Sequence, residues 1–140
     1  MSIQMILLPV FVQVALTFAL LFAMGGARAS AVRGGGVKIR DIALGQQAWP
    51  EHPTKIANCY GNQLQLPVLF YALVALAIIT RQADLLFVLL SWVFVATRLV
   101  HAWIHVGTNY VPHRFYAFAA GAIVLLVMWA IFALRILLAL

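Results

Sequence analysis

Four long apolar segments constrain the fold of this 140-residue chain more than any other feature. They cover residues 3–24, 59–80, 85–106 and 115–138, and each is long enough to cross about 30 Å of hydrocarbon as a helix. Apolar residues run continuously through each segment instead of alternating with polar ones, which excludes a transmembrane β-barrel. The sequence therefore predicts an all-α integral membrane protein, a four-helix bundle formed by a single domain over residues 1–140.

The composition supports the same class. Hydrophobic residues make up 66% of the chain and charged residues 9%, which is more apolar surface than a soluble domain of this length can bury. The net charge is +6, but the basic residues are not interleaved with aromatic ones as in a nucleic-acid-binding groove. We therefore expect a lipid bilayer around the protein and no nucleic-acid partner. The single cysteine, Cys59, excludes an intramolecular disulfide and is either a reactive thiol or inert packing.

The distribution of basic residues predicts the orientation in the membrane. Connections 25–58 and 107–114 carry an excess of basic residues, whereas the charges of connection 81–84 cancel. By the positive-inside rule, the two basic connections lie in the cytoplasm and both termini lie outside. The compact chain, without an organelle-retention tail, indicates a bacterial inner membrane.

Amide side chains gather at the start of the second apolar segment. In a continuous helix, Asn58, Asn62 and Gln65 fall at i, i+4 and i+7 and share one face. Pro67 follows in the same segment, where it frees a backbone carbonyl and can kink the helix. Amides at this depth need a protein partner, a ligand or water.

A second polar face is predicted near the cytoplasmic end of the third segment, where Arg98, His101 and His105 fall at i, i+3 and i+7. Arg98 and Gln65 lie at a similar depth, so the two faces are expected to meet. Arg98 then binds amides, carbonyls, water or an anionic ligand, or else it extends along the surface to the interface. The i, i+4 spacing of the two histidines can also hold a metal or haem. A zinc site needs at least three protein ligands, and no Asp, Glu or Cys is suitably placed, so we predict no metal site and keep haem ligation as an alternative.

Tyr110 and Arg114 lie at the cytoplasmic mouth of this predicted site. Residues of these types anchor helices at the level of the lipid headgroups. They also form anion clamps, in which Tyr110 would donate a hydrogen bond to a thiolate or oxyanion. The sequence leaves both interpretations open.

These features resemble the MAPEG family, the membrane-associated proteins in eicosanoid and glutathione metabolism. The resemblance covers nearly the whole chain and rests on Asn62-Gln-Leu-Gln65-Leu-Pro67, on Arg98-Leu-Val-His101, on the Tyr110 to Arg114 connection and on the four-span layout. Members of the family are homotrimers of four-helix protomers, which hold glutathione between protomers at the cytoplasmic side. The resemblance therefore implies a homotrimer.

The resemblance also implies roles for individual residues. Asn62 matches the family asparagine that contacts glutathione, and Gln65 stands where a glutamate is usual. Arg114 is similar to the arginine that helps to form the glutathione thiolate, and Tyr110 matches a tyrosine of that region. Asn58 stands where eukaryotic glutathione-using members commonly carry an arginine. The implied catalytic residues are Arg114 and Tyr110, and the implied ligand-binding residues are Asn58, Asn62, Gln65, Arg98 and His101.

The expected function is a glutathione-dependent transferase or peroxidase that acts on lipophilic electrophiles. The neutral side chains of Asn58 and Gln65 favour an alternative, because glutathione carries charges that a family glutamate and arginine would bind. The alternative is a non-catalytic MAPEG-fold protein that binds lipid or serves as a subunit of a larger membrane complex. The sequence does not decide whether the protein is an enzyme.

Overall fold

Helices dominate the part of the chain that the computed structural model describes, residues 1–45 and 47–139, and no strand occurs in these two ranges. Within these residues, four segments are long and apolar enough to cross a membrane, namely α1, the α3–α4 pair, α5 and α6. The predicted all-α, four-helix integral membrane protein is confirmed. The helices are α1 (Ile3–Arg33), α2 (Ile39–Ile42), α3 (Glu51–Asn62), α4 (Leu66–Ile79), α5 (Leu85–Val106) and α6 (Val111–Leu137).

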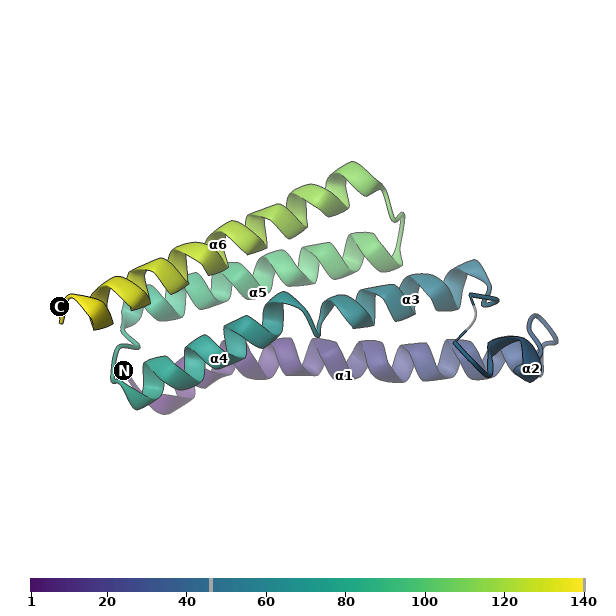
Figure 1. Cartoon of the computed structure of the whole chain (residues 1–140), viewed down its shortest axis with the longest axis horizontal. Coiled ribbons are helices and arrows are strands. Elements are labelled where there is room, and N and C mark those ends of the chain that lie inside the picture. Colours follow the sequence, from purple (N-terminus) through teal and green to yellow (C-terminus); the bar gives the residue numbers. More distant parts are fainter. Residues whose placement is uncertain (46, 140) are drawn as a thin grey trace.

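The spanning helices form an elongated bundle (Figure 1). Both termini and the α4–α5 connection lie at one end, whereas α2 and the α5–α6 connection lie at the other. Helix α5 packs against α1, α3 and α6, and it is the most buried of the spans. Because α5 is central, polar residues of the surrounding helices can contact it.

Two apolar clusters hold the bundle together. The larger one includes Phe70 of α4 and Phe94 of α5, whose ring centroids lie 4.8 Å apart, and Met128 of α6. The smaller one joins Leu20 of α1 and Ile56 of α3 nearer the end that carries α2. Many large apolar side chains remain exposed on the outer faces, where a bilayer would cover them.

Several helices extend beyond the predicted ranges. Helix α1 continues to Arg33 instead of ending at residue 24, because a glycine such as Gly25 costs a helix only about 1 kcal/mol and does not by itself end it. Helix α6 begins at Val111 instead of residue 115, because Pro112 lies in the first turn, where its missing N–H has no helical partner to lose.

The second predicted span is present as the α3–α4 pair, but it is not one continuous helix over residues 59–80. Helix α3 ends at Asn62, α4 begins at Leu66, and a break of three residues separates them. Pro67 explains the break, because it cannot donate to the carbonyl of Gln63 and its ring would clash with that carbonyl in a regular helix. Gln65 is the N-cap of α4, with φ −101° and ψ −105°, so it does not share a helical face with Asn62 as predicted.

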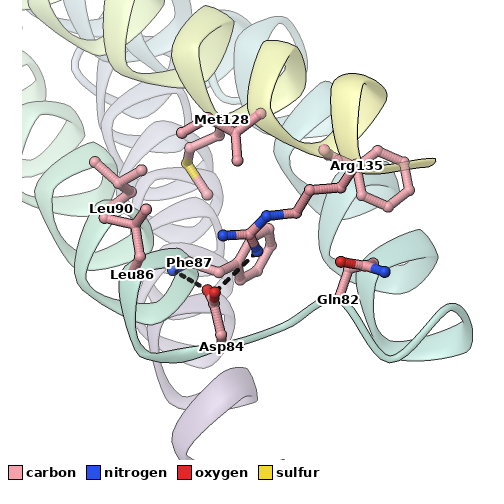
Figure 2. Close-up of a pocket in the computed structure, with 9 residues that line it drawn as sticks. Gln82, Asp84, Leu86, Phe87, Leu90, Met128 and Arg135 are labelled. Carbon is pink, nitrogen blue, oxygen red and sulfur yellow. Dashed lines mark hydrogen bonds and ion pairs between the residues drawn. The ribbon is translucent and has the colours of Figure 1, made fainter. Parts of the chain in front are cut away.

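An ion pair links two elements at the end of the bundle that carries both termini (Figure 2). Asp84 caps α5, accepting from the Phe87 N–H at 2.9 Å, and its second carboxylate oxygen lies 2.9 Å from Arg135 Nη1 in the last turn of α6. Burial alone would raise the pKa of Asp84, but the Phe87 N–H and the Arg135 guanidinium outweigh it, so the pKa lies below its ordinary value. The pair ties the α4–α5 connection to the end of α6.

Candidate functional site

An open cleft of about 570 Å³ lies between α3 and α6, both of which pack on α5. Gln65, in the break between α3 and α4, lines this cleft. His101 and His105 of α5 line it between α3 and α6. Five of the seven residues predicted for the site are thereby brought together, whereas Arg98 and Tyr110 do not line the cleft. The lining residues are Ala57, Asn58, Gly61, Asn62, Gln65, His101, His105, Val111, Arg114, Phe115 and Phe118.

A hydrogen bond between Asn62 and His105 links α3 to α5 inside the cleft. Asn62 Nδ2 lies 3.3 Å from His105 Nδ1. An amide nitrogen can only donate, so in this arrangement Nδ1 accepts and the ring proton of His105 is on Nε2. The amide oxygen of Asn62 and the Nε2–H of His105 are the groups left to contact a ligand.

Arg98 lies behind the cleft wall and is 1% exposed. Its Nη2 donates to the backbone carbonyl of Asn62 at 3.1 Å, and its Cζ lies 5.9 Å from the ring centroid of Phe118. Within the described part of the chain, its Nε and Nη1 have no hydrogen-bond partner. The side chain points into the bundle, so the alternative of an arginine extended along the surface to the interface is wrong.

Arg114 enters the cleft from the first turn of α6. Its Nη1 donates to Asn109 Oδ1 at 2.7 Å, and Asn109 has φ +52°, a left-handed conformation that asparagine tolerates well. Tyr110, the N-cap of α6, is 54% exposed and lies edge-on to the ring of His113, with centroids 4.6 Å apart. Within one chain, therefore, Tyr110 and Arg114 do not converge on the same cavity.

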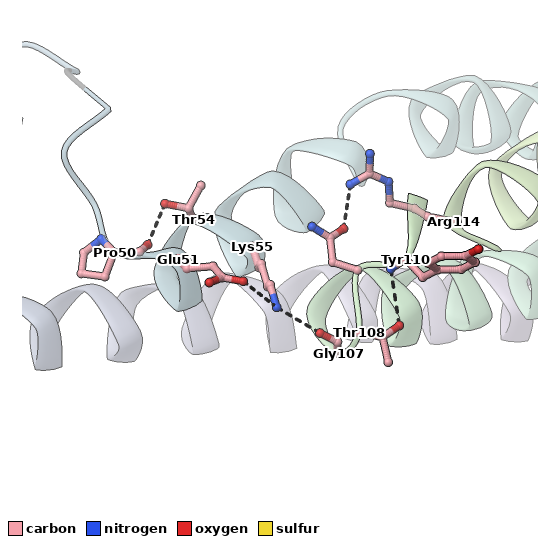
Figure 3. A network of polar contacts seen from close by, with 9 residues as sticks. Pro50, Glu51, Thr54, Lys55, Gly107, Thr108, Tyr110 and Arg114 are labelled. Carbon is pink, nitrogen blue, oxygen red and sulfur yellow. Dashed lines mark hydrogen bonds and ion pairs between the residues drawn. The ribbon is translucent and has the colours of Figure 1, made fainter. Parts of the chain in front are cut away.

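A polar network supports the mouth of the cleft (Figure 3). Lys55 of α3 donates to the carbonyl of Gly107 at 3.2 Å, and it lies 3.2 Å from the Glu51 carboxylate. Gly107 is the C-cap of α5, so the lysine places a positive charge where the helix dipole is negative. This contact fixes α3 against α5 next to Arg114.

His101 and His105 lie next to each other on α5. Among the described residues, no group of three or more His, Cys, Asp or Glu side chains could hold a metal ion. The rings of His101 and His105 lie 5.4 Å apart and edge-on, and His105 Nδ1 is already engaged by Asn62. Cys59 is fully buried, which favours inert packing over a reactive thiol.

Comparison with known proteins decides the family. The model of the MAPEG family matches residues 6–134, nearly the whole chain. The chain belongs to the MAPEG family. Comparisons with curated proteins and with solved structures gave no significant match.

Two buried glutamines that were not among the predicted site residues bind each other in this MAPEG protein. Gln13 of α1 and Gln63 of the break are both 0% exposed, and Gln13 Nε2 donates to Gln63 Oε1 at 2.9 Å. The sequence did contain a signal, because an amide inside an apolar span is costly unless it has a partner. It did not contain the identity of that partner, which lies 50 residues away.

An apolar groove lies next to the cleft of this MAPEG protein. It has a volume of about 500 Å³ and lies between the start of α4 and the middle of α6. Leu66 follows the cleft residue Gln65, and Ala122 lies one helical turn after the cleft residue Phe118. The groove is lined by Leu66, Leu69, Ala122, Leu125, Leu126 and Trp129.

Proposed function

We propose that this MAPEG protein binds glutathione in the cleft and uses its thiol on a lipophilic electrophile or peroxide held in the apolar groove. The observation that carries the proposal is that two unlike cavities lie next to each other between the α3–α4 pair and α6. A cleft with amides, imidazoles and Arg114 is followed along α6 by a groove of aliphatic side chains. A water-soluble thiol and a membrane-soluble substrate need this pairing.

The chemistry of glutathione fits the groups in the cleft. Its carboxylates would bind Arg114, and its ammonium would bind the amide oxygens of Asn58, Asn62 and Gln65, which are neutral acceptors. Arg114 would also favour the thiolate over the thiol. In a transfer reaction the thiol loses its proton to water, and sulfur forms a bond to the electrophilic carbon as the bond from that carbon to its leaving group or ring oxygen breaks; the released group then takes up a proton from water. With a peroxide, the O–O bond breaks to give an alcohol and water, and two glutathione molecules are oxidised to their disulfide.

The assembly and orientation belong to the same proposal. The cleft lies toward the end of the bundle that carries α2 and the α5–α6 connection, both flanked by basic residues. By the positive-inside rule this end faces the cytoplasm, where glutathione is available in a bacterial inner membrane, and both termini lie outside. A homotrimer would cover the open side of the cleft. Tyr110, which is exposed and does not line its own cleft, would then contact a neighbouring protomer.

The test is binding of glutathione to detergent-purified protein, followed by calorimetry and by the ultraviolet absorbance of the thiolate. We expect saturable binding in the millimolar range or tighter, with thiolate formation that disappears in Arg114→Ala. The matched control is Arg33→Ala, which removes an exposed arginine outside the cleft. Absence of binding at millimolar glutathione would contradict the proposal.

A non-catalytic role is the second candidate, and the neutral Asn58 and Gln65 in the cleft favour it. In that case the apolar groove would hold a bilayer lipid or another hydrophobic ligand, and the protein would serve as a lipid carrier or as a subunit of a larger membrane complex. Native mass spectrometry distinguishes the two candidates. A lipid that stays bound in wild type and is lost in Ala122→Phe, together with no glutathione binding, would support this second role.

A further inference from the structure

The break between α3 and α4 leaves backbone groups without regular helical partners inside a membrane span. The N–H of Gln63 turns to the carbonyl of Tyr60, at 2.9 Å, and the N–H of Leu64 turns to the carbonyl of Gly61, at 3.0 Å. Both bonds reach three residues back instead of four, so the carbonyl of Cys59 loses the backbone donor that a continuous helix would supply. In hydrocarbon such a carbonyl is costly unless another group binds it.

The side chain of Gln63 takes the place of its own backbone N–H. Its Nε2 donates to the carbonyl of Cys59 at 2.9 Å, four residues back. Its Oε1 accepts from Gln13 Nε2 of α1, also at 2.9 Å. Because both ends of the amide are engaged and both glutamines are 0% exposed, the Gln63 side chain cannot turn without losing two buried hydrogen bonds.

Arg98 of α5 binds the backbone of the same break. Its Nη2 donates to the carbonyl of Asn62, which also accepts from the N–H of Gln65 at 3.3 Å. The break is therefore held by α1 through Gln13 and by α5 through Arg98. These two contacts fix Asn62, the last residue of α3, relative to Gln65, the N-cap residue of α4.

The residues on either side of the break are the ones that face the ligand cleft. Asn62 ends α3, Gln65 caps α4, and both line the cleft, whereas Gln13 and Gln63 do not. We propose that the Gln13–Gln63 bridge, together with Arg98, positions the amides of Asn62 and Gln65 for binding. Gln13, Gln63 and Arg98 are thus positioning residues that act on affinity without touching the ligand.

This inference rests on the proposed binding of glutathione, and its physical basis is the fraction of molecules ready to bind. If the break adopts other arrangements, the apparent dissociation constant rises in inverse proportion to the binding-competent fraction. Loss of the buried Gln13–Gln63 hydrogen bond should therefore weaken binding about threefold to tenfold. A purely structural role would instead lower the folded fraction and leave the affinity of the folded protein unchanged.

The test uses Gln13→Met, Gln63→Met and the double variant, because methionine keeps the approximate volume and removes the amide. We expect each single variant to bind glutathione about threefold to tenfold more weakly per folded protein. Because the two glutamines share one bond, the double variant should lose less than the product of the two single losses. The control is Ser91→Ala, which removes a buried hydroxyl bonded to the carbonyl of Phe87, away from the break.

Hydrogen exchange separates failure of this inference from failure of the proposed function. The backbone N–H groups of Leu64 and Gln65 should exchange faster in both methionine variants than in wild type and in Ser91→Ala. If wild type does not bind glutathione, the proposed function fails and the exchange rates still test the bridge. The inference is overturned if exchange is unchanged, or if binding is measurable and the methionine variants match Ser91→Ala.

Discussion

Arg98 donates from Nη2 to the backbone carbonyl of Asn62 across the interface between α5 and α3, at 3.1 Å. The guanidinium thereby binds a carbonyl at the end of a broken helix, although no carboxylate is paired with it among the salt bridges of the described chain. Asn62 in turn contacts His105 through its side chain. Two residues of α5 thus hold the same asparagine by its backbone and by its side chain.

Arg98→Met is expected to weaken glutathione binding about tenfold while the protein stays folded. The substitution takes a donor from the Asn62 carbonyl, but it also removes a buried charge, so the free energy of unfolding should change little. Calorimetry measures the affinity, and size-exclusion chromatography in detergent measures the folded fraction. Arg98→Lys keeps the charge on a shorter side chain and should bind as weakly as Arg98→Met; wild-type affinity in the lysine variant would show that charge, not the hydrogen bond, matters.

Arg114→Ala should lower turnover more than affinity. If the guanidinium stabilises the thiolate, its loss affects the reacting sulfur more than the rest of glutathione. A drop in kcat of about 100-fold is expected, with a smaller loss of affinity, about tenfold, from the carboxylate that Arg114 also binds. Steady-state kinetics with a lipophilic electrophile and separate binding titrations measure the two effects. The Arg33→Ala control should behave as wild type. Equal kinetic constants in Arg114→Ala and wild type would remove Arg114 from the mechanism.

Filling the apolar groove should separate the two substrates. Ala122 lines the groove, and Ala122→Phe places a ring in the path of a lipophilic substrate. The KM for that substrate should rise about tenfold, an effect comparable to losing well-packed apolar contacts, while glutathione affinity stays the same. Ala120→Phe, on an exposed position of the same helix, is the matched control. A parallel loss of glutathione affinity in Ala122→Phe would argue against two adjoining sites.

Asp84 should make stability depend on acid pH. Its pKa is lowered in the folded protein, so its contribution is fully present above the ordinary value of 3.8 and is lost as the pH falls through the lower folded value. Asp84→Ala should lower the free energy of unfolding by about 1 kcal/mol at neutral pH, the usual effect of losing an N-cap. Thermal unfolding in detergent should show the difference in Tm from wild type shrinking only below about pH 3.8.

The control for this prediction is Asp41→Ala. That carboxylate is exposed on α2 and lies 4.0 Å from Arg40, a surface pair that contributes little. Its removal should leave Tm unchanged across the same pH range. A difference between wild type and Asp84→Ala that grows on acidification would contradict the lowered pKa.

The membrane class and the number of spans are determined by the sequence alone. The length of an apolar run and the absence of alternation are local properties, and the thickness of hydrocarbon converts them directly into spanning helices. The sequence also identifies the polar residues inside the spans. Gln13, Asn62 and Arg98 are among the few that occur there, and each needs a hydrogen-bond partner. The predicted match of Asn62 and Gln65 to family positions is likewise read from neighbouring residues.

Only the tertiary structure decides which partners those residues find. The bond from Gln13 to Gln63 joins residues 50 apart, and its existence depends on the rotation of α1 against the break, which no local pattern encodes. For the same reason the sequence named a carbonyl only as one of several possible partners of Arg98 and did not identify it as that of Asn62. Nor did it predict that Tyr110 would lie outside the cleft. Spans follow from hydrophobic length, whereas hydrogen-bond partners follow from how finished helices pack, and packing is a property of the whole bundle.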